Sequence, residues 1–85
     1  MHIDISGLRI DLTDALHDHV NTEFKKFEKI LDPSARIVVE IGKTTDHHKQ
    51  GDIFKAEGRI IEPKAEYFAN IVSEDLYTAI NSLSD

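Results

Sequence analysis

The spacing of the apolar residues changes along this chain, and that change constrains its fold more than any other feature. Ile3 and Ile5 alternate with polar residues, which is the period of a strand. Over residues 12–31 the apolar residues are instead three or four positions apart, so they lie on one face of a helix. These residues are Leu12, Leu16, Val20, Phe24, Phe27 and Leu31. A short chain that switches from one period to the other is expected to pack a helix against a sheet.

The strand period returns three times after this helix. It runs over residues 35–41, 52–62 and 67–72, with a polar loop at 44–51 and a turn at Pro63-Lys64. A second helix then carries an apolar stripe of Leu76, Ala79, Ile80 and Leu83. Thr13 and Ser73 are the predicted N-caps of the two helices. Asp32-Pro33 is expected to end the first helix, because the residue before proline disfavours the helical region.

The predicted fold is an α+β, two-layer β-α-β-β-β-α domain that spans residues 1–85. The first two strands are joined by a helical crossover and are expected to be parallel, whereas the remaining hairpins are antiparallel. The result is a four-stranded mixed sheet with two helices packed on one face. The other face is expected to be open to water, with Lys55, Glu57 and Arg59 pointing outward. Because the apolar stripe still runs at Asp85, we expect the last helix to be truncated.

Composition excludes several classes of function. The chain has no cysteine, which rules out a disulfide scaffold, a cysteine-ligated zinc and a thiol nucleophile. No apolar run is long enough to cross a membrane, and the alternating residues after Met1 do not resemble a signal peptide. The net charge of −6 argues against a general nucleic-acid binder, which is usually basic.

Chemical motifs are sparse. Asp46-His47-His48 could supply metal ligands, but no third and fourth ligand follow at a usual spacing, so a polar loop is the favoured interpretation. His17 and His19 fall on opposite flanks of the helical stripe and are interpreted as surface residues. No nucleophile elbow, phosphate-binding glycine loop or converging carboxylate pair is evident. We therefore predict a protein that is not an enzyme, with no metal, cofactor or small-molecule substrate.

A basic cluster in the first helix is the remaining candidate site. Lys25, Lys26 and Lys29 lie in its C-terminal half, with Lys25 and Lys29 expected to point away from the core and Lys26 on the flank. Glu28 lies between them in sequence but is expected to face another side. Such a cluster attracts phosphate. The alternative is that these lysines complement the helix dipole.

Five segments resemble one known family. In the first half of the chain they are Ile3-x-Ile5-x-Gly7, Leu12-Thr13-Asp14-Ala15-Leu16 and Phe24-Lys25-Lys26-Phe27-Glu28-Lys29. In the second half they are His47-His48-Lys49-x-Gly51-Asp52-x-Phe54-Lys55-Ala56-Glu57 and Ser73-Glu74-Asp75-Leu76-Tyr77-x-Ala79-Ile80. Together they resemble the ribosome hibernation factors, also called ribosome-associated inhibitors or sigma-54 modulation proteins, and specifically their N-terminal domain. Glu-Asp-Leu-Tyr is the most specific part.

This resemblance implies a cytoplasmic factor that binds the small ribosomal subunit, both its RNA and its proteins. It implies occupancy of the channel for messenger and transfer RNA, inhibition of translation and ribosome hibernation under stress. Lys25, Lys26 and Lys29 would hold ribosomal RNA phosphates, and His17 would join them when protonated. The chain departs from the family in two respects. Family members often carry basic residues where this chain has His17 and Glu23, and family members continue the second helix into a basic run.

The alternative function is a protein-interaction module that does not contact RNA. The acidic net charge favours it. So does the open sheet face, where Ile53, Ile61 and Phe68 are expected to form an apolar surface.

Overall fold

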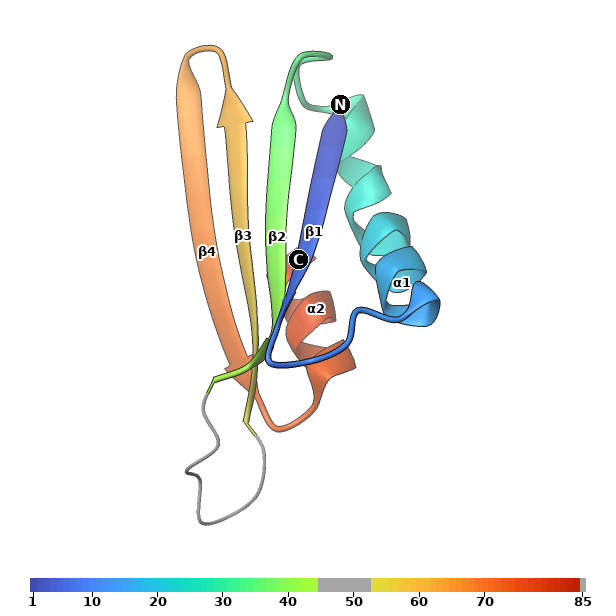
Figure 1. Cartoon of the computed structure of the whole chain (residues 1–85). Helices are drawn as coiled ribbons and strands as arrows, with labels where there is room; N and C mark the ends of the chain where they lie inside the picture. The colour runs from blue at the N-terminus through green and yellow to red at the C-terminus, as the bar shows by residue number, and fades with distance from the viewer. Residues whose placement is uncertain (45–52, 85) are drawn as a thin grey trace.

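The computed structural model describes residues 1–44 and 53–84, and in these ranges the predicted order β-α-β-β-β-α is confirmed (Figure 1). The strands are β1 (His2–Leu8), β2 (Arg36–Lys43), β3 (Phe54–Glu62) and β4 (Ala65–Ser73). The helices are α1 (Asp14–Phe24), a short 3₁₀ helix η1 (Lys25–Lys29) that continues it, and α2 (Leu76–Ser84). None of the described helices has the length and apolar character needed to cross a membrane.

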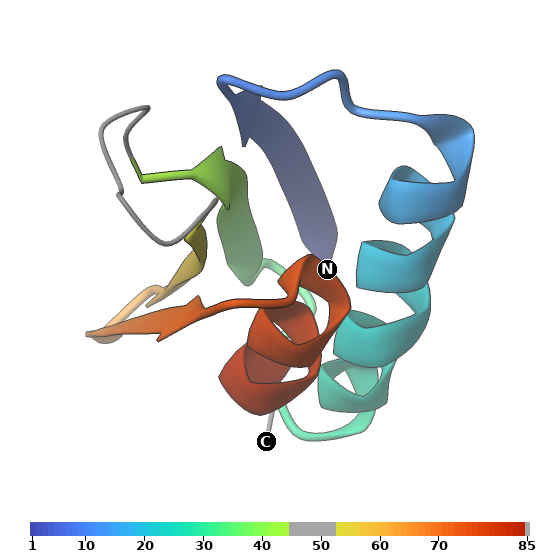
Figure 2. The ribbon, with the colours of Figure 1, turned by 90° about the horizontal axis from the view of Figure 1, so that it is seen from below.

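The four strands form one mixed sheet in the order β1-β2-β3-β4. β1 is parallel to β2, and Ile5 lies opposite Val39. β3 is antiparallel to both of its neighbours, with Ala56 opposite Ile41 on one side and Ile71 on the other. Figure 2 shows α1 and α2 on the same side of this sheet. The predicted two-layer α+β architecture is therefore confirmed.

The core lies between the helices and the central strand β2. Ile37, Val39 and Ile41 of β2 are fully buried, as the alternating pattern predicts. α1 covers them with Val20 and Phe24, and α2 covers β3 with the predicted stripe, in which Ala79, Ile80 and Leu83 are buried. Removing this apolar surface from water is the main force that holds the layers together.

The predicted helix over residues 12–31 is wrong in extent and in type. α1 begins only at Asp14, because the Thr13 hydroxyl accepts the backbone N–H of Leu16 at 3.2 Å, which confirms Thr13 as the N-cap. After Phe24 the chain winds more tightly into the 3₁₀ helix η1. A 3₁₀ helix has three residues per turn, so Phe24 and Phe27 align along one side, and their ring centroids are 5.7 Å apart.

The second helix is capped by Asp75, and the prediction of Ser73 is wrong. The Asp75 carboxylate accepts the hydroxyl of Thr78 at 2.7 Å and its backbone N–H at 2.9 Å. These two hydrogen bonds hold the pKa of Asp75 below its usual value. Ser73 is still the last residue of β4, and its hydroxyl accepts the N–H of Asp75 at 3.2 Å. The cap therefore lies two residues later than the sequence indicates.

Candidate nucleic-acid interface

Basic side chains on the open face of the sheet contact carboxylates. Each close ion pair cancels most of the positive potential that its cation would exert on a distant phosphate. The open face is therefore a poor site for an anion, although it carries three cations in its centre. The pairs are Arg36–Asp4 at 2.7 Å, Lys55–Glu40 at 2.9 Å and Arg59–Glu66 at 3.3 Å.

The lysines of η1 have a different environment. Lys25, Lys26 and Lys29 are all exposed, and all three belong to η1. Lys25 and Lys29 form no ion pair with any described residue. Lys26 places its Nζ atom 5.5 Å from the centroid of the Phe27 ring, in a cation–π arrangement that orients the side chain. All three side chains lie at the surface of the molecule.

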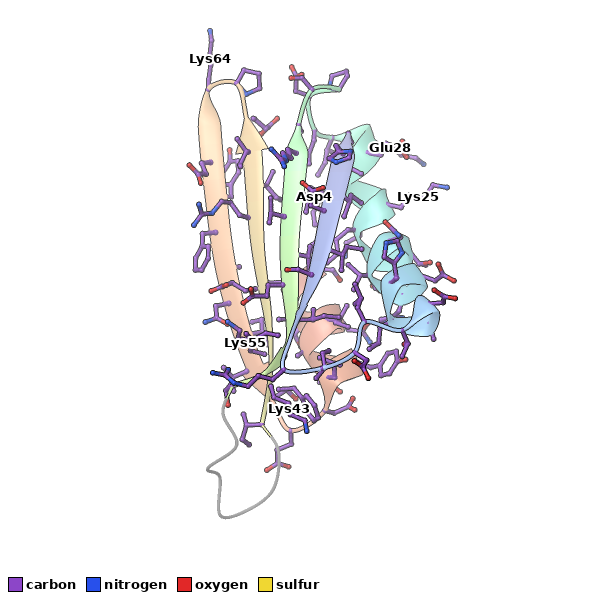
Figure 3. The ribbon with its side chains drawn as sticks, in the orientation of Figure 1. Asp4, Lys25, Glu28, Lys43, Lys55 and Lys64 are labelled. Atoms are coloured by element: carbon purple, nitrogen blue, oxygen red, sulfur yellow. The ribbon has the colours of Figure 1, made fainter. Side chains whose placement is uncertain are left out.

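The 3₁₀ winding decides which of these lysines share a side. With three residues per turn, Lys26 aligns with Lys29, and Lys25 aligns with Glu28. Lys25 and Lys29 are both exposed, as the sequence predicted, whereas the prediction that Glu28 faces a different side is wrong with respect to Lys25. Lys25 and Glu28 line the same shallow hollow beside Met1. Figure 3 shows both side chains projecting from the same side of the helix. Glu28 thus offsets the charge of Lys25.

His17 lies on the same side of the helix as Lys25. Residues four apart are neighbours on an α-helix, and His17, Asn21 and Lys25 follow that spacing. His17 Nδ1 lies 3.0 Å from the amide nitrogen of Asn21. When this amide donates to Nδ1, the ring proton resides on Nε2. In that tautomer the Nε2 atom of His17 can donate a hydrogen bond.

The predicted site residues therefore divide into two neighbouring groups. Lys26 and Lys29 form one group, which we name the lysine pair. His17 and Lys25 form the other, on the side of α1 that faces the start of β1. The sequence pattern placed the three lysines in one cluster, and only the resemblance added His17 to them. The tightening of the last turn, which separates them, was signalled only by the single spacing of three between Phe24 and Phe27.

His19 was interpreted as a surface residue, but it joins the two helices. Its ring lies edge-on to Tyr77 of α2, with centroids 4.8 Å apart, and its Nε2 is 2.8 Å from the side-chain oxygen of Asn81. A second contact between the helices is made by the Ser84 hydroxyl, which donates to Glu23 at 3.2 Å. These contacts join α1 to α2 at the surface of the helix layer.

The described residues contain no group of three histidine, cysteine, aspartate or glutamate side chains arranged to hold a metal. His47 and His48, the candidate ligands in the sequence, lie outside the described residues. A shallow hollow of about 350 Å³ on the open face is lined by Arg36, Glu40 and Arg59, among others. These are ion-paired groups, so this hollow has no carboxylate poised for acid–base chemistry.

Comparison with known proteins identifies a family and named relatives. The family model described as Sigma 54 modulation protein / S30EA ribosomal protein matches residues 3–85. A curated relative from Azotobacter vinelandii, named ribosome hibernation promoting factor, is 37% identical over 86 residues, which cover 100% of this chain and 74% of that protein. A protein of the same name from Escherichia coli K12 is 29% identical over 87 residues, covering 100% and 83% respectively.

A solved structure shows the same architecture. The crystal structure of the Thermus thermophilus Protein Y N-terminal domain matches with a TM-score of 0.83 and 22% sequence identity, covering 99% of this chain and 88% of that one. At this level of identity the likeness establishes the fold alone.

Proposed function

The chain belongs to the Sigma 54 modulation protein / S30EA ribosomal protein family, and from this membership we propose that it is a ribosome hibernation factor that binds the small ribosomal subunit. It acts in the cytoplasm, where ribosomes are, and it acts by binding rather than by catalysis. The observation that carries this proposal is the lysine pair, two exposed cations that lie along one side of η1.

The proposed mechanism is occlusion of the channel that holds messenger and transfer RNA. A rigid two-layer domain fills space in the channel, which inhibits translation. Lys26 and Lys29 contact the phosphates of ribosomal RNA and release condensed counterions. Lys25 and His17 form a weaker second contact, because Glu28 shares the hollow with Lys25. Recognition is by shape and backbone, as is usual for folded RNA.

The net charge of −6 fits this mechanism when its distribution is considered. α1 and η1 are polarised, with Asp14 and Asp18 in the first half and the lysines at the end. An acidic surface away from the lysine pair repels RNA that approaches in any other orientation. It can also contact basic ribosomal proteins. The charge therefore opposes indiscriminate RNA binding while permitting one orientation.

Co-sedimentation with purified small ribosomal subunits across a salt series tests the proposal. The variant K26Q/K29Q removes the lysine pair and brings the net charge from −6 to about −8. Each lost phosphate contact lowers the slope of log affinity against log salt by about 0.7–0.9, so we expect a decrease of about 1.4–1.8. K64E is the matched control, because it makes the same change in net charge but in the β3–β4 turn, outside η1 (Figure 3).

The proposal fails if the wild-type chain does not sediment with subunits at low salt. The role of the lysine pair fails separately, if K26Q/K29Q and K64E show the same salt slope. In that case the lost affinity follows net charge and not position.

A protein-interaction module remains the second candidate. Ile61 and Phe68 are exposed on the open face, 37% and 57% respectively, as the sequence predicted, whereas Ile53 is half-buried. These side chains favour a protein partner over RNA, because they are apolar and carry no charge for a phosphate. Contacts that they make are expected to be insensitive to salt. A partner captured by the wild-type chain at high salt and lost in the variant I61S/F68S, with no sedimentation of ribosomal subunits, would favour this function.

A further inference from the structure

Tyr77 is an exposed aromatic residue in the first turn of α2. It contacts the ring of His19 on α1 edge-on, with centroids 4.8 Å apart and the two planes at 67°, and it is still 42% exposed. An edge contact of this kind uses at most one face of the tyrosine ring. The Tyr77 hydroxyl has no hydrogen-bond partner among residues 1–44 and 53–84. Tyr77 therefore presents part of an aromatic ring to solvent.

Asn81 lies one helical turn beyond Tyr77 on α2, and its side chain is also exposed. An amide oxygen can only accept, so the Nε2 atom of His19 donates to the Asn81 side-chain oxygen, at 2.8 Å. This bond orients the amide and leaves its NH2 group with two donors that no residue in the described part of the chain accepts. An aromatic ring beside an oriented amide is a combination that binds unpaired RNA bases, by stacking and by hydrogen bonds to the base edge.

The contacts between α1 and α2 follow a line that leads to the lysine pair. His19 and Lys26 are seven residues apart, which is about two helical turns, so they lie on the same side of the helix and about 10 Å apart along its axis. Glu23 lies between them on this side, where it accepts the Ser84 hydroxyl of α2 at 3.2 Å. Figure 2 shows α1 and α2 next to each other. The exposed ring and the lysine pair therefore belong to one continuous surface.

The charges along this line favour different parts of a nucleotide at its two ends. Asp18, which is exposed and precedes His19, and Glu23 both carry carboxylates near the tyrosine ring. Carboxylates repel a phosphate but do not repel an uncharged base. The cations of the lysine pair lie beyond Glu23, at the end of the line. One RNA strand can therefore place a phosphate at the lysine pair and a base at Tyr77.

We propose that Tyr77 and Asn81 form a binding site for one unpaired base of the RNA whose phosphates contact the lysine pair. Tyr77 stacks on the base, and the Asn81 amide donates to an acceptor on its edge. His19 is a positioning residue, because it contacts both side chains. This inference rests on the ribosome-binding function proposed above, and it adds contact with a base to the contacts with phosphates.

Co-sedimentation with small ribosomal subunits across a salt series separates this contact from those of the lysines. Y77L removes the ring, and we expect about tenfold weaker binding at every salt concentration, because stacking on an aromatic side chain contributes about this factor. The slope of log affinity against log salt should stay at its wild-type value, since no phosphate contact is lost. Y77F keeps the ring, so it should bind like the wild type. F68L is the matched control, because it removes an exposed ring from the open face of the sheet.

Three results would overturn the base site while leaving the proposed function in place. Y77L could bind like the wild type, Y77F could bind as weakly as Y77L, or F68L could weaken binding as much as Y77L does. A wild-type chain that does not sediment with subunits removes the proposed function itself, and the base site with it.

Ultraviolet cross-linking of the wild-type chain to the subunits identifies the partner of Tyr77 without any variant. Ultraviolet light joins a base to an aromatic ring that stacks on it, and cleavage after glutamate separates Tyr67, in peptide 67–74, from Tyr77, in peptide 75–85. We expect peptide 75–85 to carry a nucleotide and peptide 67–74 to carry none. A nucleotide on peptide 67–74 alone, a ribosomal protein on peptide 75–85, or no cross-link at all would overturn the inference.

Discussion

Replacing Gly42 should destabilise the fold strongly, and the structure shows why. A Cβ atom on Gly42 would lie 1.9 Å from the backbone oxygen of Leu8, because the end of β1 crosses β2 at this point. Backbone cannot rotate away as a side chain can, so the end of β1 must move. The movement would break the last rung of the ladder and the contact of Arg9 with the carbonyl oxygen of Thr44, now 3.0 Å long.

The expected cost of G42A follows from these losses. Overpacking costs about 1–3 kcal/mol, and each lost hydrogen bond adds about 1 kcal/mol. We expect a decrease of about 3 kcal/mol in the free energy of unfolding, out of the roughly 4–13 kcal/mol typical of a domain this size. At about 4–8 °C per kcal/mol, the melting temperature should fall by about 12–24 °C.

Gly58 provides the matched control. A Cβ atom on Gly58 would lie 3.2 Å from Cδ2 of Leu83, the far end of a flexible side chain. Leu83 can shift by a few tenths of an ångström, and alanine also reduces the entropy of the unfolded chain, which contributes about 0.4–1 kcal/mol. G58A should therefore stay within about 1 kcal/mol of the wild type. Urea unfolding followed by circular dichroism measures both variants, and equal costs for G42A and G58A would refute the argument.

Two further predictions concern charge. The pKa of Asp75 is lowered by its hydrogen bonds with Thr78, and the pKa of Asp4 is lowered chiefly by its hydrogen bond with Arg36. The stabilisation of the fold by these two carboxylates is therefore complete above their usual pKa of 3.8, and it is lost as the pH falls through the lowered pKa values. D75N keeps the cap but cannot titrate, so its urea midpoint should fall less steeply with acid than the wild-type midpoint; parallel curves would contradict this. K25Q should change the slope of log affinity for the subunit against log salt less than K29Q does, because Glu28 already offsets the charge of Lys25. Equal slopes for the two variants in co-sedimentation would show that Glu28 does not offset Lys25.

Local sequence signals were sufficient for the order of elements and for the fold class. The alternation of Ile37, Val39 and Ile41 predicts a buried central strand, and all three side chains are buried. Thr13 was identifiable as an N-cap because threonine is among the residues preferred at that position, and Asp14 follows it in the first turn. The exposed lysines were identifiable from position alone. These features depend on residues a few positions apart, so they can be read from the chain itself.

Tertiary contacts decided the features that matter most for function. η1 winds more tightly because Phe24 and Phe27 must both meet the core, and this winding separates Lys25 from the lysine pair. β4 extends through Ser73, which moves the cap to Asp75. Ser73 and Asp75 are both good capping residues in isolation, so only strand pairing could choose between them.

The sequence by itself therefore determined the order of the helices and strands and the buried residues of the central strand, because these properties arise from local periodicity. Only the tertiary structure decided which charges are cancelled and which sheet edge is free. Lys55 and Lys29 are indistinguishable as outward-facing lysines in the sequence, yet Lys55 contacts Glu40 from a neighbouring strand and Lys29 forms no ion pair within the described residues. The physical reason is that electrostatic partners and strand neighbours come from residues distant in sequence, and only the fold brings them together.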